Sequence, residues 1–291
     1  MTFHAPVRKP YGVAPSPYMA QGAGKGLWKG LAFIAPFQTK KGAGTSTLLD
    51  RFGHPLAGSN LVASPTLVWT GTPYGLGIDV SDGTDHRRLR QAAFAPVTTS
   101  DGAGGGDFTV IMLANPRSEA RIACGLSQRL ASGNLNQFQL SFNYNSTPDI
   151  SAGSLFFGTY NAAWSTVAAA GMVDGNYHVF GGVRRSGTMT LWRDGVSVAT
   201  GSPTLHNIYS ASADFSIGGV AHDTGFGMSP GDSVVFVAAW NRALTNFEML
   251  LLGIDPFIMF RPAPRRKIIN TVAAGTAVPV FMHHYMQQRA A

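Results

Sequence analysis

The stretch N-Y-H-V-F-G-G-V-R-R-S-G-T-M-T-L-W-R-D-G-V-S-V-A-T, residues 176–200, decides the fold class. Apolar residues alternate with polar or small ones in period two up to residues 185–187 (R-S-G), where a turn is expected. The alternation resumes over 188–193, and Asp194-Gly195 then supplies two residues that tolerate the positive φ angles of a tight hairpin turn. A third alternating run begins at Val196. We therefore predict three consecutive antiparallel strands joined by two tight turns.

Outward from this stretch, short β-prone runs recur at about ten-residue spacing, which is typical of a β-sandwich. We expect strands within 27–37, 67–69, 76–80, 108–113, 137–144, 155–157, 215–219 and 234–240. The last of these runs is apolar throughout, which predicts a strand that is covered on both faces.

A short helix should follow that last strand. Thr245 and Glu248 have the spacing of a capping box, and Leu244 and Met249 are placed for a hydrophobic staple. Gly253 is expected to end the helix.

The composition supports one all-β domain with two appendages. The 291 residues are 45% hydrophobic and only 13% charged, with 35 glycines and 17 prolines, which favours many turns over long surface helices. Prolines crowd residues 1–26, so we predict an extended N-terminal arm there, a sandwich domain over 27–260, and a basic, proline-containing C-terminal arm over 261–291. The β-prone runs of this second arm suit strand addition to a neighbour.

Cysteine content and hydropathy bear on the compartment. Cys124 is the single cysteine, so no internal disulfide can form. The N-terminus has no apolar signal core, and no run of about 18 apolar residues occurs. We expect synthesis in a cytoplasm without membrane insertion.

Charge is concentrated at the two ends of the chain. Residues 1–49 carry six basic residues and 261–291 carry five, with no acid in either segment, whereas 50–260 hold 11 basic and 15 acidic residues. Such asymmetry indicates arms that contact an anionic partner, although basic tails can also be simply solvated. The candidate partner-binding residues are Arg8, Lys9, Lys25, Lys29, Arg261, Arg265, Arg266 and Lys267.

Three motifs in this order carry a family resemblance. They are residues 30–33 through 50–54 (G-L-A-F to D-R-F-G-H), residues 176–178 with 191–195 (N-Y-H and L-W-R-D-G), and residues 241–251 followed by 255–262. Together they resemble the LamG-like, concanavalin A-like jelly-roll domains found in bacteriophage virion proteins, with Tyr177 where tryptophan is usual. The resemblance spans about residues 27–264 and implies two antiparallel sheets packed face to face as a jelly-roll sandwich.

The resemblance implies little about a ligand, because folds of this class host lectins, hydrolases and structural modules alike. We expect a non-enzymatic virion structural protein, a capsid decoration (cement) or minor capsid protein made in the host cytoplasm. Its arms would anchor it on the major capsid protein or other virion subunits, as a homo-oligomer on the particle and with no cofactor.

The alternative is a carbohydrate-binding adhesin module on a tail or fibre that recognises host glycans. Tyr144, Tyr160 or Trp192 would then be stacking platforms, although these residue types more often pack in cores. Glycoside hydrolysis needs two carboxyl groups, and the chain has only two glutamates, Glu119 and Glu248.

Metal and nucleic-acid sites have weaker signals. His283 and His284 are adjacent, so on a strand their side chains would point in opposite directions, which is unfavourable for binding one metal ion together. A calcium ion at the rim would need converging Asp or carbonyl oxygens, for which Asp79, Asp82 and Asp85 or Asp223 are the candidates. The basic tails lack the interleaved aromatic residues that stack on single-stranded nucleic acid.

Overall fold

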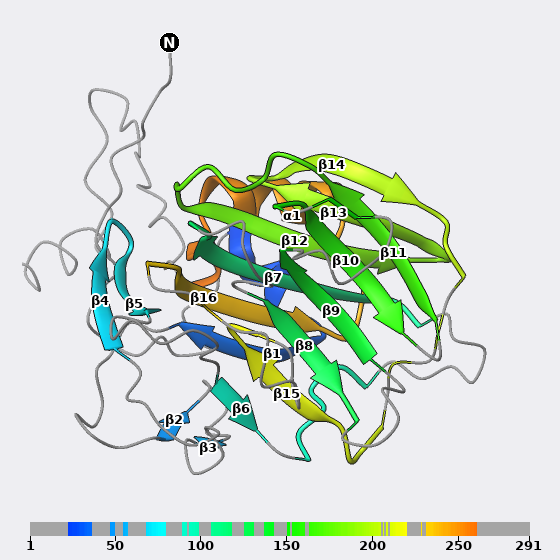
Figure 1. Ribbon diagram of the computed structural model, residues 1–291, viewed down its shortest axis with the longest axis horizontal. Helices are drawn as coiled ribbons and strands as arrows, with labels where there is room; N and C mark the ends of the chain where they lie inside the picture. Colours follow the sequence, from blue (N-terminus) through cyan, green and yellow to red (C-terminus); the bar gives the residue numbers. More distant parts are fainter. Residues whose placement is uncertain are drawn as a thin grey trace, which may run out of the picture.

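The structure is a computed structural model, and the chain forms a two-layer β-sandwich (Figure 1). The structure describes residues 23–36, 47–49, 55–57, 68–79, 89–91, 93–98, 106–117, 125–130, 137–142, 150–151, 153–160, 163–204, 206, 208, 210–219, 228 and 231–260. In Figure 1 strands of the smaller sheet lie in front of strands of the larger one. The predicted fold class, an all-β, antiparallel, two-sheet sandwich, is confirmed.

The larger sheet has eight strands in the order β14-β13-β12-β7-β16-β5-β4, with β1 also paired to β16. Its strands are β1 (Leu31–Pro36), β4 (Val68–Thr72), β5 (Gly75–Asp79), β7 (Phe108–Asn115), β12 (His178–Arg185), β13 (Thr188–Arg193), β14 (Val196–Gly201) and β16 (Ser233–Trp240).

The smaller sheet has six strands in the order β11-β10-β9-β8-β15-β6. Its strands are β6 (Leu89–Gln91), β8 (Leu126–Arg129), β9 (Gln137–Phe142), β10 (Leu155–Tyr160), β11 (Trp164–Ala169) and β15 (Asp214–Ile217). A separate two-stranded sheet pairs β2 (Thr47–Leu49) with β3 (Pro55–Ala57).

The predicted three-stranded meander is β12, β13 and β14. Ser186 and Gly187 connect the first two strands with φ of 44° and 89°, and Asp194 and Gly195 connect the next two with φ of 50° and 79°. Both turns thus have two consecutive left-handed residues, the conformation whose twist matches that of the flanking strands. The sequence prediction is confirmed at both turns.

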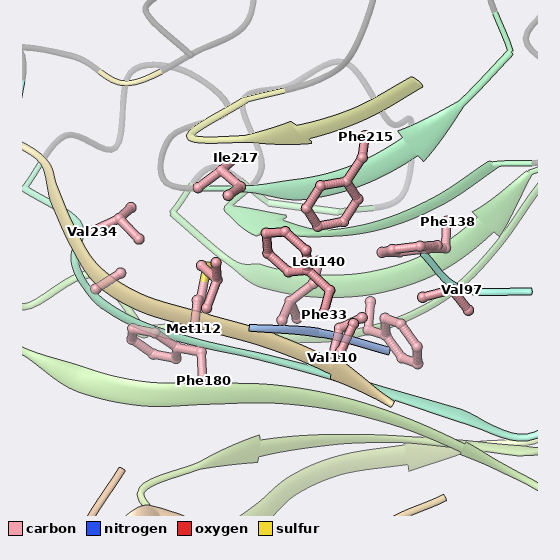
Figure 2. Close-up of a cluster of buried hydrophobic side chains, with 14 of the residues drawn as sticks. Phe33, Val97, Val110, Met112, Phe138, Leu140, Phe180, Phe215, Ile217 and Val234 are labelled. Carbon is pink, nitrogen blue, oxygen red and sulfur yellow. The ribbon is translucent and has the colours of Figure 1, made fainter. Parts of the chain in front are cut away.

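The main core lies between the two sheets (Figure 2). Phenylalanine rings bridge the layers: Phe108 lies 5.4 Å from Phe157 and Phe180 lies 4.9 Å from Phe142, measured between ring centroids. Each fully buried ring contributes about 1.5–3 kcal/mol from removal of apolar surface from water. These contacts fix which face of each strand points inward.

A second apolar layer covers the outer face of the larger sheet. It is formed by side chains of that sheet together with η2 (Ala23–Trp28), α1 (Asn246–Ile254) and η4 (Ile258–Phe260). Strand β16 contributes to both layers and is buried along its whole length, as its unbroken apolar sequence predicts. The outer face of this sheet is therefore part of the interior.

Two boundaries differ from the sequence prediction. Element η2 begins at Ala23, four residues inside the predicted N-terminal arm, because the body binds this turn: Trp240 Nε1 donates to the Leu27 carbonyl at 2.6 Å, and Arg242 Nη2 donates to the Gly26 carbonyl at 2.9 Å. Helix α1 has the predicted capping box, but it runs past Gly253 to Ile254. Gly253 instead allows the helix backbone to lie against the backbone of Asp194 and Gly195.

Candidate functional site

Three aromatic side chains gather on the outer face of the smaller sheet, at the β10–β11 hairpin. Leu155 and Phe157 of β10 belong to the main core, so Phe156 and Tyr160 alternate to the other face. Trp164 begins β11 directly opposite Tyr160 and meets both outward rings. We call Phe156, Tyr160 and Trp164 the aromatic platform.

The geometry of the platform leaves two of its rings ordered and partly accessible. Trp164 lies edge-on to Phe156 at 5.8 Å and tilted against Tyr160 at 5.1 Å, between ring centroids. The Trp164 ring rests on the strand backbone at Gly158, where a Cβ would lie 3.1 Å from Trp164 Cε3. Phe156 is buried beneath, while Tyr160 and Trp164 remain partly exposed. The two upper rings are thus held in place and still reach solvent.

The side chains of the platform and of its neighbour Thr166 are uncharged. Thr166 follows Trp164 on the same outward face of β11, and its Cγ2 is also near Gly158. The tyrosine and threonine hydroxyls both donate and accept hydrogen bonds. Ring faces flanked by hydroxyl groups can pack against the C–H face of a pyranose or furanose and bond its hydroxyls.

The predicted stacking residues have different outcomes. Tyr160 is in the platform, whereas Trp192 is only 7% exposed because it packs in the apolar layer beneath α1. Tyr144 lies outside the described residues. Sequence reasoning missed Trp164, although a tyrosine and a tryptophan four residues apart between two β-prone runs are a usable signal for rings that meet across adjacent strands.

A charged cluster lies at the β13–β14 turn, formed by Asp174, His178, Arg193 and Asp194. His178 is held between two carboxylates: its Nδ1 is 2.6 Å from Asp194 Oδ2 and its Nε2 is 3.0 Å from Asp174 Oδ2. Arg193 also pairs with Asp174. Burial acts to lower the pKa of His178, but the hydrogen bond and charge of Asp194, together with Asp174, outweigh it and raise the pKa above its ordinary 6.5.

The hydrogen bonds of this cluster hold the backbone of the β13–β14 turn in place. Asp194 Oδ1 accepts from the Val179 amide at 2.9 Å, and the Asp194 amide donates to the Val179 carbonyl at 2.8 Å, so the turn is fastened to the start of β12. Burial acts to raise the pKa of Asp174, but hydrogen bonds from Asn176, His178 and Arg193 lower it overall. An ionised carboxylate fixed in this way is unsuited to the general-acid role of a glycosidase.

Glu248, one of the two glutamates considered for glycoside hydrolysis, is structural. Its side chain accepts from the Thr245 amide at 2.8 Å and from Arg242 Nη2 and Nη1 at 2.6 and 2.9 Å. Burial acts to raise its pKa, but the hydrogen bonds from Arg242 and Thr245 lower it overall. Glu119 lies outside the described residues.

The predicted arm contacts are described at two positions only. Lys29 is exposed, and its carbonyl accepts from Arg242 Nε at 2.7 Å. Lys25 is one of the residues of η2. The remaining candidates, Arg8, Lys9, Arg261, Arg265, Arg266 and Lys267, lie outside the described residues, as do the β-prone runs of the C-terminal arm.

No trio of His, Cys, Asp or Glu side chains suited to a metal ion occurs in the part of the chain that the structure describes. Asp79 lies in β5 opposite Ser233, and Asp82, Asp85, Asp223, His283 and His284 lie outside that part. Within the same residues, no helix is long and apolar enough to cross a membrane.

Comparison with known proteins shows the fold alone. No family model and no curated protein matches the sequence. The structure is similar to the binding domain of Paraclostridial Mosquitocidal Protein 1, at 13% identity and a TM-score of 0.54 over 78% of this chain, which spans about half (52%) of that one. It is also similar to domain 4 of AbnA, an extracellular arabinanase from Geobacillus stearothermophilus, in complex with arabinotriose, at 13% identity and a TM-score of 0.52, covering 77% of this chain and 98% of that domain.

Proposed function

We propose that the sandwich is a carbohydrate-binding domain and that the aromatic platform of Phe156, Tyr160 and Trp164 holds the sugar. The observation that carries the proposal is the Trp164 ring, immobilised over Gly158 and against two other rings yet still open to solvent. Side chains ordered before binding lose little entropy when a ligand arrives.

The class of ligand follows from the platform's chemistry. Phe156, Tyr160, Trp164 and Thr166 carry no charge, which favours a neutral oligosaccharide over an acidic one. The arabinanase domain with the same architecture is bound to arabinotriose, a neutral sugar, and this supports the choice of a first probe. The carboxylates Asp174 and Glu248 have lowered pKa values and are hydrogen-bonded elsewhere, so we propose binding without hydrolysis.

The test is a glycan array followed by calorimetry on any neutral glycan that binds, with arabinotriose as the first probe. Trp164→Ala should weaken binding at least tenfold, because an aromatic contact gives about 0.5–1.5 kcal/mol beyond its buried area and tenfold corresponds to about 1.4 kcal/mol. Phe247→Ala, which removes an exposed ring from the opposite outer face of the sandwich, is the matched control, and it should leave the affinity of the single site, as measured by calorimetry, unchanged.

Two outcomes would contradict the proposal. One is an array without hits, and the other is a glycan that the Trp164→Ala protein binds with undiminished affinity. Since Trp164→Ala can loosen the hairpin, Trp164→Phe is measured beside it and should retain part of the affinity, with thermal unfolding used to check that both variants are folded.

A second role is favoured by the charge distribution. We propose that the domain is carried on a virion, where the basic segments 1–22 and 261–291 attach it to an acidic surface of the capsid or of other virion subunits. The role is compatible with glycan binding by the body. A chain reduced to residues 23–260 should stay folded and no longer sediment with particles, whereas retained sedimentation would contradict attachment through the arms.

A further inference from the structure

The outward side of α1 is an exposed apolar stripe. Phe247, Leu250 and Ile254 are 65%, 41% and 72% exposed, and their spacing of i, i+3 and i+7 places them on one face of the helix. Val196, 62% exposed, extends the stripe, because the β13–β14 turn meets the helix at Leu250: a Cβ on Gly195 would lie 2.8 Å from Leu250 Cα.

Among the described residues, the large exposed hydrophobic side chains gather in this one stripe. Val196, Phe247, Leu250 and Ile254 are all of the large hydrophobic side chains that are exposed among the described residues, and all four lie here. An apolar surface that gathers in one place on an otherwise well-buried domain marks an interaction surface. The platform, in contrast, lies on the outer face of the other sheet.

The ends of the stripe differ in charge. Arg185 is exposed beside the N-terminal end of α1, where its Nη1 is 3.5 Å from Asn246 Oδ1 and its Nη2 donates to the Leu244 carbonyl. The C-terminal end has Asp255 at the C-cap and no basic residue in the last turn. Asp255 and the negative end of the helix dipole give this end of the stripe a negative character.

We propose that the stripe binds a second copy of this chain, with the two α1 helices antiparallel about a two-fold axis near Leu250. In that arrangement Phe247 of each copy packs near Ile254 of the other, and Arg185 of each copy approaches the negative C-terminal end of the other helix. The patch is self-complementary, as a two-fold interface requires. A parallel arrangement would instead bring like ends together.

The size of the patch predicts the strength of the pairing. One helix face and one turn bury less than the roughly 1,200–2,000 Å² of a stable standard interface, so the isolated dimer should be weak. Each copy would direct its aromatic platform away from the interface. Because the two platforms would then face in opposite directions, the dimer would bridge two separate glycan-bearing surfaces rather than bind one surface twice. The dimer does not depend on the sugar proposal, because the two use opposite faces.

The test is sedimentation equilibrium of the full chain over a concentration series. The wild-type protein should show a reversible monomer–dimer equilibrium. Ile254→Lys should weaken it at least tenfold, because a charge would be buried in the stripe, and Ala168→Lys, an exposed position on β11, is the matched control that should leave it unchanged. A protein that stays monomeric at every concentration, or a dimer indifferent to Ile254→Lys, would overturn the proposal.

Cross-linking tests the geometry. In a Cys124→Ser background, Leu250→Cys should form a disulfide-linked dimer on mild oxidation and Ala168→Cys should not. A mixture of Phe247→Cys and Ile254→Cys proteins should link preferentially to each other, as resolved by mass, if the helices are antiparallel; preferential self-linking would overturn that orientation. If Cys124→Ser does not fold, the same cysteine variants are made with Cys124 retained, and their cross-linking is compared with that of the wild-type protein.

Discussion

Gly253 lies in the last turn of α1, where the helix backbone touches the backbone of the β13–β14 turn. A Cβ at this position would lie 2.5 Å from Gly195 Cα and closer still to the Gly195 nitrogen and the Asp194 carbonyl carbon. Carbon atoms prefer separations of about 3.5–4.0 Å, so Gly253→Ala requires the helix to move by about 1–1.5 Å. The turn itself cannot easily yield, because Asp194 is bonded twice to Val179.

Two opposing terms set the size of the effect. Alanine is better than glycine inside a helix by about 1 kcal/mol, so helix propensity alone predicts stabilisation. Overpacking costs about 1–3 kcal/mol, and the upper end applies here because the clash is with backbone and displaces Met249 and Leu252 from the apolar layer. We expect Gly253→Ala to lower the free energy of unfolding by about 2 kcal/mol.

Urea unfolding, followed by fluorescence and circular dichroism, measures this change. The control is Gly71→Ala in β4, where an added Cβ meets nothing within 4 Å, and which should be neutral or stabilising by up to about 1 kcal/mol. If Gly253→Ala is as stable as wild type or more stable while the control behaves as expected, helix propensity outweighs the contact and the reasoning is refuted.

Two further predictions concern polar contacts. Because folding raises the pKa of His178 above 6.5, protonated His178 stabilises the folded state fully below about pH 6.5, and this stabilisation is lost as the pH rises through the folded-state pKa. The urea midpoint of wild type should therefore fall over that pH range, whereas the midpoint of His178→Gln should change less. The same dependence of the urea midpoint on pH in both proteins would contradict this. Thr245 Oγ1 accepts from the Glu248 amide at 3.2 Å, so Thr245→Ala should cost about 1 kcal/mol and Thr245→Ser, which retains the acceptor, much less; equal thermal midpoints for the two variants would contradict the cap.

Local sequence chemistry predicted the elements whose causes are local. The turn at Asp194-Gly195 needs only two residues that tolerate positive φ, and the capping box needs only Thr245 and Glu248 at the right spacing. Gly253 fails as a local signal because its cause is tertiary: it allows the helix to approach a turn more than fifty residues earlier in the chain. Asp174 is followed by Gly175, a pair that locally indicates only a turn, whereas the pairing of Asp174 with His178 and Arg193 depends on the folded arrangement.

The candidate site was only partly predictable for a related reason. Trp164 and Trp192 both lie on strands with alternating patterns and both point away from the main core, so their local sequences do not distinguish them. They differ because α1, η2 and η4 cover the outer face of the larger sheet, which buries Trp192, whereas Trp164 lies on the outer face of the smaller sheet and stays partly exposed. Which tryptophan is accessible to the proposed sugar ligand is thus decided by where α1 packs, and a helix packed against the other sheet would reverse the exposure of the two rings.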